Sequence, residues 1–176
     1  MLLVSRAPPE VFGFGATIRT LIDNTLADLD LLHLAGRAVN TLSGGEQQRT
    51  HFARALVQAI AGRRQGGSGI LLLDEPTTGL DLRHQLEMLS VFKRQADDGM
   101  LVAAVLHDLN LAALVADQIF VLDRGRLDSA GSPAEVINDP MIERVFGVGL
   151  RVGQLPTSGI PFVLPQTVMA SLPDST

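Results

Sequence analysis

The sequence contains no cysteine, a single lysine, and no apolar run close to the roughly 20 residues that a membrane-spanning helix needs. The absence of cysteine excludes a disulfide framework and a thiolate metal site. The first ten residues place no basic segment ahead of their short apolar start, so they make a poor export signal. The formal net charge of −5 gives no reason to expect a nucleic-acid partner.

Strand and helix signals alternate along the chain, whose 46% hydrophobic and 19% charged residues are typical of a globular domain. Apolar residues recur at helical spacing over 18–34, and a longer helix begins at Ser43 and ends in a glycine-rich loop over 62–69. The elements expected after that loop are buried strands over 70–73 and 101–106, helices after Asp81 and Asp108, and a hairpin turning at 124–125. This order predicts an α/β fold with a mainly parallel sheet, and residues 1–15 are expected to be irregular.

Two acids, Asp74 and Glu75, directly follow the strand expected over 70–73. Open α/β sheets bind their ligands at the carboxyl ends of the strands, so a carboxylate pair there needs a partner. One carboxylate could hold Mg²⁺ through water, and the next could polarise an attacking water. The alternative, that the acids only cap the following turn, stays open from these two residues alone.

Ser43, Gly44 and Gly45 open the longer helix, and Glu46 completes a capping box with Ser43. Glycines at a helix N-terminus leave backbone N–H groups accessible, and the helix dipole adds positive potential there, so this point could bind phosphate. An ordinary capped helix explains the four residues equally well. His107 directly follows the second expected strand and could donate to a phosphate at the same edge, although a histidine in such a place is more often a surface or capping residue.

Four segments in a fixed order resemble the second half of an ATP-binding-cassette (ABC) ATPase, a P-loop NTPase. These are LSGGEQQR at 42–49, ILLLDEP at 70–76, TTGLD at 77–81 and His107 after a strand. They are similar to the signature motif, the Walker B strand, the D-loop and the switch histidine of that family. The resemblance covers about residues 15 to 147. It implies a helical signature subdomain over 16–62, the C-terminal half of the ATPase core over 63–147, and a tail over 148–176.

The resemblance implies a head-to-tail dimer of two ATPase subunits that holds two ATP molecules at its interface. Ser43, Gly44 and Gly45 would contact the γ-phosphate of the ATP held by the other subunit. Asp81 would carry a signal across the dimer.

The same resemblance gives roles to the residues at the strand ends. Asp74 would hold Mg²⁺, Glu75 would act as the general base on the attacking water, and His107 would bind the γ-phosphate. Side chains tied up in internal salt links and pointing away from the ligand edge would contradict these roles.

The single lysine matters because the family's phosphate loop follows the pattern G-x-x-x-x-G-K-[ST], in which the lysine reaches the β- and γ-phosphates. Lys93 stands in the middle of an expected helix with no glycine loop before it. We therefore expect the chain to be N-terminally truncated relative to the family pattern. On its own it should neither bind ATP tightly nor hydrolyse it.

Residues 107–113, 116–117, 131–136 and 145–147 resemble the ATPase subunits of bacterial importers for heme, iron-siderophores or vitamin B12. Within that group, residues 80–85 and 159–166 resemble hemin importers most. That resemblance implies integral-membrane permease subunits as partners and a peripheral place on the cytoplasmic face of the inner membrane. Two alternatives remain. One is a DNA-repair type ABC ATPase, which would carry long coiled-coil heptads that this sequence lacks. The other is a non-catalytic partner subunit that supplies only its signature helix, and the reading frame upstream of residue 1 would distinguish it.

Overall fold

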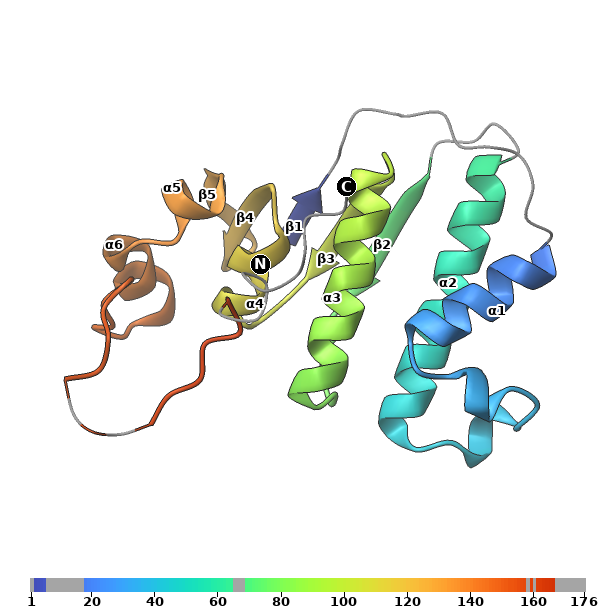
Figure 1. Cartoon of the computed structure of the whole chain (residues 1–176). Coiled ribbons are helices and arrows are strands. Elements are labelled where there is room, and N and C mark those ends of the chain that lie inside the picture. Colours follow the sequence, from blue (N-terminus) through green and yellow to red (C-terminus); the bar gives the residue numbers. More distant parts are fainter. Residues whose placement is uncertain (1, 6–17, 65–68, 158, 160, 167–176) are drawn as a thin grey trace, which may run out of the picture.

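The computed structural model describes residues 2–5, 18–64, 69–157, 159 and 161–166 (Figure 1). In chain order the elements are β1 (Leu2–Ser5), α1 (Ile18–Asp28), η1 (Leu32–Leu34), η2 (Val39–Thr41), α2 (Gly44–Arg64), β2 (Ile70–Asp74), α3 (Leu82–Asp97), β3 (Leu101–Val105), α4 (Leu109–Val115), β4 (Gln118–Asp123), β5 (Arg126–Gly131), α5 (Pro133–Val136), α6 (Asp139–Met141) and the π-helical turn η3 (Ile142–Phe146). Among the described helices, none combines the length and the apolar character that crossing a membrane requires.

The five strands form one mixed sheet in the order β2-β3-β1-β4-β5. Only β2 and β3 pair in parallel, whereas β1 is antiparallel to both β3 and β4, and β5 is antiparallel to β4. The sheet is therefore mixed, whereas the sequence predicted a mainly parallel one. The β4–β5 connection is a tight turn at Arg124 and Gly125, both with positive φ, and so short a turn can join only antiparallel strands.

The N-terminal strand is the second reason for the mixed sheet. Residues 2–5, predicted to be irregular, form β1 in the middle of the sheet, and they separate β3 from β4. Proline and glycine at positions 8, 9, 13 and 15 led to the prediction of an irregular segment, but those positions lie outside the described residues. A four-residue strand has too short a pattern to be recognised without its neighbours.

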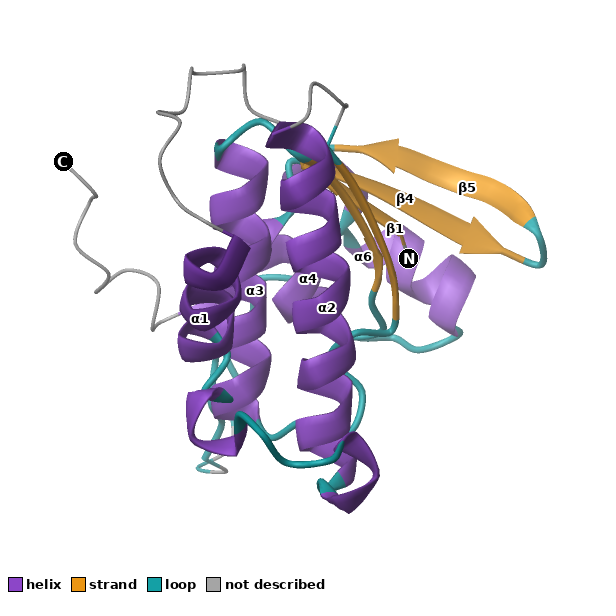
Figure 2. Ribbon diagram, turned by 90° about the vertical axis from the view of Figure 1, so that its right-hand side faces the viewer, coloured by secondary structure: helices purple, strands orange, loops and turns teal. Residues whose placement is uncertain are grey.

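Helices α1, α2 and α3 stand on one side of the sheet, and the β4–β5 hairpin extends away from them (Figure 2). Helices α2 and α3 are joined by Phe52 and Phe92, whose rings meet edge to face with centroids 5.1 Å apart. Met88 and Leu89 of α3 are completely buried beneath them. These residues form part of the core that fixes the positions of α2 and β2 relative to each other.

Burial along β2 alternates, contrary to the prediction of a strand buried on both faces. Leu71 faces the helices and is 3% exposed, whereas Ile70 and Leu72 are 51% and 74% exposed. The physical reason is that β2 is an edge strand whose helices cover one face only. The prediction holds for β3, where Val102, Ala103 and Ala104 are all buried.

Candidate functional site

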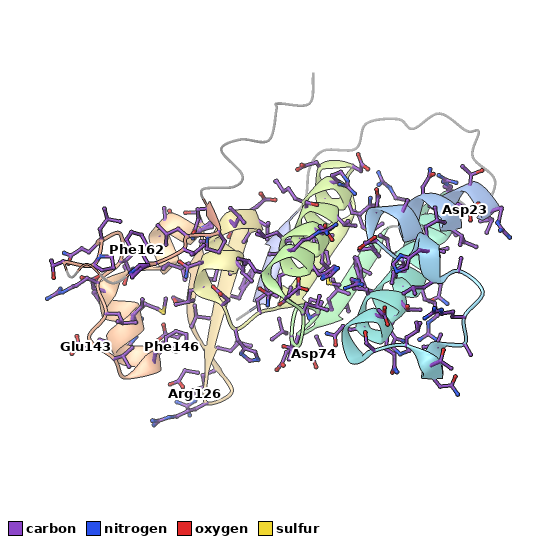
Figure 3. The ribbon with its side chains drawn as sticks, turned by 60° about the horizontal axis from the view of Figure 1, so that its bottom comes forward. Asp23, Asp74, Arg126, Glu143, Phe146 and Phe162 are labelled. Atoms are coloured by element: carbon purple, nitrogen blue, oxygen red, sulfur yellow. The ribbon has the colours of Figure 1, made fainter. Side chains whose placement is uncertain are left out.

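The carboxyl ends of β2 and β3 bring the predicted acids and the predicted histidine to one edge of the sheet. Asp74 is the last residue of β2 and stands opposite Val105, the last residue of β3. Glu75 follows Asp74, and His107 lies two residues beyond β3. In Figure 3 Asp74 is labelled in the central part of the molecule, between Asp23 on one side and Phe146 and Glu143 on the other. Parallel pairing is what makes two segments about 30 residues apart in sequence meet here.

Glu75 and His107 are in direct contact. Their atoms Oε1 and Nε2 are 2.6 Å apart, and the hydroxyl of Thr78 donates to the other Glu75 oxygen at 3.3 Å. The hydrogen bond and charge of His107 hold the pKa of the Glu75 carboxyl below its usual value, with a smaller contribution from Thr78. This link joins two predicted site residues at the ligand edge itself. In the structure the His107 ring nitrogen contacts Glu75, and its predicted role in binding phosphate stays a prediction.

Asp74 has an exposed carboxylate that makes no hydrogen bond or ion pair with the rest of the described chain. No group of three or more potential metal ligands gathers in the part of the protein that the structure describes. Mg²⁺ in nucleotide sites is commonly held by one or two carboxylates together with water and substrate phosphates. Asp74 fits that limited role, and the described residues do not build a metal site without a substrate.

The start of α2 has the predicted capping box. The backbone N–H of Ser43 donates to Glu46 Oε2 at 2.7 Å, and the N–H of Glu46 faces Ser43 Oγ at 3.4 Å. The Ser43 N–H, followed by its hydroxyl, lowers the pKa of the Glu46 carboxyl. Ser43 and Gly44 are exposed, whereas Gly45 is half-buried, and a Cβ atom added to it would lie 3.3 Å from Leu80 Cδ2. The helix start therefore packs directly against the turn that leads to α3.

Asp81 is the N-cap of α3, as predicted, and accepts a hydrogen bond from the His84 N–H at 3.0 Å. The His84 ring adds a contact that sequence reasoning missed, with Nδ1 at 2.8 and 2.9 Å from the two Asp81 oxygens. The His84 N–H, followed by the ring, lowers the pKa of Asp81. The spacing of an acid and a histidine three residues apart at a helix start was the available signal.

Gln48 is a second residue that sequence reasoning missed. Its side-chain amide reaches from α2 to the carbonyl oxygens of Glu75 and Pro76, at 3.1 Å from each. No local pattern predicts this contact, because its partners lie 27 and 28 residues along the chain. The neighbouring Arg49 is buried, and its charge contributes to the lowered pKa values of Glu46 and Asp81.

In comparisons with known proteins, the family model and the similar sequences all concern ABC transporters or import ATP-binding proteins. The family model described as ABC transporter matches residues 10–78. The hemin import ATP-binding protein HmuV of Rhodopseudomonas palustris strain BisB18 is 48% identical over 172 residues, which cover 94% of this chain and 64% of that protein. The protein of the same name from Mesorhizobium japonicum is 49% identical over 147 residues, 84% of this chain and 56% of that protein. The chain thus spans less than two thirds of the length of these relatives.

Solved structures give the same fold. A chain of an inward-facing ABC transporter, described as being of the metal-chelate type, superposes with a TM-score of 0.60 at 25% identity, covering 80% of this chain and 53% of that one. An ATP-binding cassette of another ABC transporter superposes with a TM-score of 0.59 at 19% identity, covering 78% of this chain and 53% of that one. At that identity the second likeness concerns the fold alone.

Proposed function

This chain belongs to the family of ABC transporter ATP-binding domains, and from that premise we propose that it is part of the ATPase subunit of a hemin importer. The observation that carries the proposal is the contact of Glu75 with His107 at the carboxyl edge of the sheet, beside Asp74. A carboxylate and an imidazole at this edge can handle the proton and the charge of phosphoryl transfer to water.

In the proposed reaction Glu75 accepts a proton from the water that attacks the γ-phosphorus of ATP, while the bond from that phosphorus to the bridging oxygen breaks and ADP leaves. The Glu75 carboxylate is ionised at neutral pH, as a glutamate is even without a lowered pKa, and its contacts with His107 and Thr78 fix the direction in which its oxygens point. Asp74 would hold Mg²⁺, which neutralises charge on the phosphates. His107, which is exposed, would donate a hydrogen bond to a phosphate oxygen after its ring turns from Glu75.

In the proposal, the start of α2 in this chain faces a second subunit. Gly44 carries a backbone N–H group at the positive end of a 21-residue helix, and such an end favours phosphate, whereas the N–H of Ser43 is already bonded to Glu46. In a head-to-tail dimer residues 43–45 would contact the ATP held by the partner, and Asp81 would lie at the same interface. Permease subunits in the inner membrane complete the proposed importer, with this chain bound peripherally on the cytoplasmic side. The cargo, hemin, is proposed from the names of the relatives.

We expect the 176-residue chain alone to bind no ATP tightly. Its single lysine, Lys93, lies on α3, and its ammonium is 3.0 Å from Asp97 and 3.2 Å from Asp117, so it is committed to two carboxylates. Isothermal titration of the purified chain with Mg-ATP should give no micromolar binding. A micromolar dissociation constant would contradict this part of the proposal.

Activity can be tested in a fusion that places the N-terminal region of the strain BisB18 relative ahead of this chain. The fusion should hydrolyse ATP, and Glu75→Gln should lower kcat by about 100-fold or more, because the general base is lost. Glu143→Gln on η3, which Figure 3 shows at a distance from Asp74, serves as the matched control. A folded fusion without ATPase activity, or one in which Glu75→Gln hydrolyses as fast as the parent, would refute the proposed function.

A further inference from the structure

Gln48 links two parts of the site that the sequence separates. It lies in the first turns of α2, the helix whose start carries residues 43–45. Its Nε2 atom is 3.1 Å from the carbonyl oxygen of Glu75 and 3.1 Å from that of Pro76. A primary amide has two N–H donors, so one side chain can satisfy both carbonyl groups at once.

The backbone that Gln48 holds is under strain. Glu75 has a φ of 45°, in the left-handed region that a side-chain-bearing residue adopts only when its surroundings impose it. Further hydrogen bonds support the turn, among them those from the Thr78 N–H to Glu75 O at 3.2 Å and from the Gln85 amide to Thr77 O at 3.3 Å. Of these contacts, only the Gln48 amide connects the strained residue to α2.

We propose that Gln48 is a positioning residue that fastens the Glu75 turn to α2, so that the start of α2 and the catalytic carboxylate of one subunit move together. The proposal rests on the proposed function, in which residues 43–45 face the ATP held by the partner and Glu75 faces the ATP of its own subunit. A helix is a stiff body, so a displacement of its first turn on binding one ATP would reach the turn that acts on the other. Gln48 would thereby couple the two nucleotide sites.

Gln47 provides a matched control on the same helix. Its side-chain amide donates to the Leu42 carbonyl at 2.8 Å, a bond confined to the start of α2. Gln47 and Gln48 therefore have the same side chain and both donate to backbone carbonyls, but only Gln48 reaches the Glu75 turn. Methionine at either position keeps the length of the side chain and removes the amide.

The first test is ¹³C NMR titration of the Glu75 carboxyl in the 176-residue chain, which requires neither ATP nor ATPase activity. Gln48→Met should raise the pKa of Glu75 toward its usual value, because a loosened turn weakens the contact of Glu75 with His107. Gln47→Met should leave it unchanged. An unchanged Glu75 pKa in folded Gln48→Met, or an equal rise in both variants, would overturn the positioning role.

A measurement on the unmodified chain keeps the proposal testable if Gln48→Met does not fold. The Gln48 side-chain N–H₂ group should exchange with solvent at least about tenfold more slowly than that of the exposed Gln154, because both of its protons are bonded. Equal exchange rates would overturn the contact itself.

The ATPase fusion tests the coupling. In it, Gln48→Met should lower kcat by between about 10-fold and about 100-fold, because the catalytic group is misplaced. The KM for ATP should stay within about twofold of the parent value. A Glu75 pKa that rises while kcat stays at the parent value would refute the coupling. An inactive parent fusion would refute the proposed function, while the NMR result on the 176-residue chain would still decide whether Gln48 positions Glu75.

Discussion

His107 changes the acidity of Glu75 although the His107 side chain is exposed and that of Glu75 is only half-buried. Burial would raise the pKa of a carboxyl, but here the contact with His107 outweighs that effect and lowers it. The direct 2.6 Å contact explains why a residue on the surface can still have a defined orientation. At the scale of single residues, the site therefore depends on a pair and not on either side chain alone.

Replacing His107 tests the pair. His107→Ala should raise the pKa of the Glu75 carboxyl, because the hydrogen bond and the charge that lower it are both removed, and ¹³C NMR measures the change directly. Since the folded-state pKa of Glu75 lies below its ordinary value, the contact stabilises the fold above that ordinary value, and this stabilisation is lost as the pH falls through the folded-state pKa. His107→Ala should therefore weaken the dependence of stability on pH in that acid range.

His33→Ala is the control for this experiment, because His33 lies 3.8 Å from Asp30, near α1, and has no contact with Glu75. It should leave the Glu75 titration unchanged. The role of His107 would be disproved by a Glu75 pKa that does not move in His107→Ala.

The start of α2 shows how one helix end can serve both capping and packing. Two glycines stand next to each other, yet their surroundings differ. Gly44 has no atom within 4 Å of an added Cβ, whereas Gly45 lies against Leu80. Both have ordinary backbone angles, because neither has positive φ. Packing therefore does not require glycine at position 44. Glycine at position 45 allows Leu80, in the segment 77–81, to lie close to the start of α2.

This difference predicts different stabilities for two alanine variants. Gly44→Ala should raise the free energy of unfolding by about 0.4–1 kcal/mol, because alanine loses less backbone entropy on folding. Gly45→Ala should gain clearly less, since Leu80 must shift by a few tenths of an ångström to accept the new methyl group. Urea unfolding of both variants measures the difference, and equal stabilisation would show that the contact with Leu80 is not tight.

The whole molecule has a sheet that its helices cover unevenly. At β2 the face away from α2 and α3 presents Ile70 and Leu72 to solvent, on a strand that is also the edge of the sheet in the described structure. An apolar edge strand with one open face is a site at which sheets associate. Self-association of the isolated chain is therefore expected to begin here.

Lysine at neighbouring positions of β2 distinguishes the two faces. Leu72→Lys should change the free energy of unfolding by no more than about 0.5 kcal/mol and should reduce self-association, measured by analytical ultracentrifugation. Leu71→Lys should cost roughly 3 kcal/mol or more, because it removes a buried side chain and buries an unpaired charge. If Leu72→Lys associates as strongly as the unmodified chain, the open face of β2 is not the contact surface.

Sequence reasoning predicted the α/β class, which the fold of related ABC structures confirms, and the positions of most elements. It also predicted that Asp81 and Asp108 cap the helices that follow them, as they do. The catalytic roles of Glu75 and His107, the Mg²⁺ role of Asp74 and the phosphate role of residues 43–45 remain predictions. The mixed sheet, the strand at residues 2–5 and the open face of β2 were not predicted.

What the sequence by itself determined about this protein is local: the capping box at Ser43, the helix starts, the positions of strands and the residues of each family motif. These depend on residues within a few positions of one another, so their signals can be read along the chain. Only the tertiary structure decided that β1 enters the sheet antiparallel, that helices leave one face of β2 open, and that Gln48 reaches the Glu75 turn. Each of these depends on contacts between distant segments, which exist only once the chain has folded.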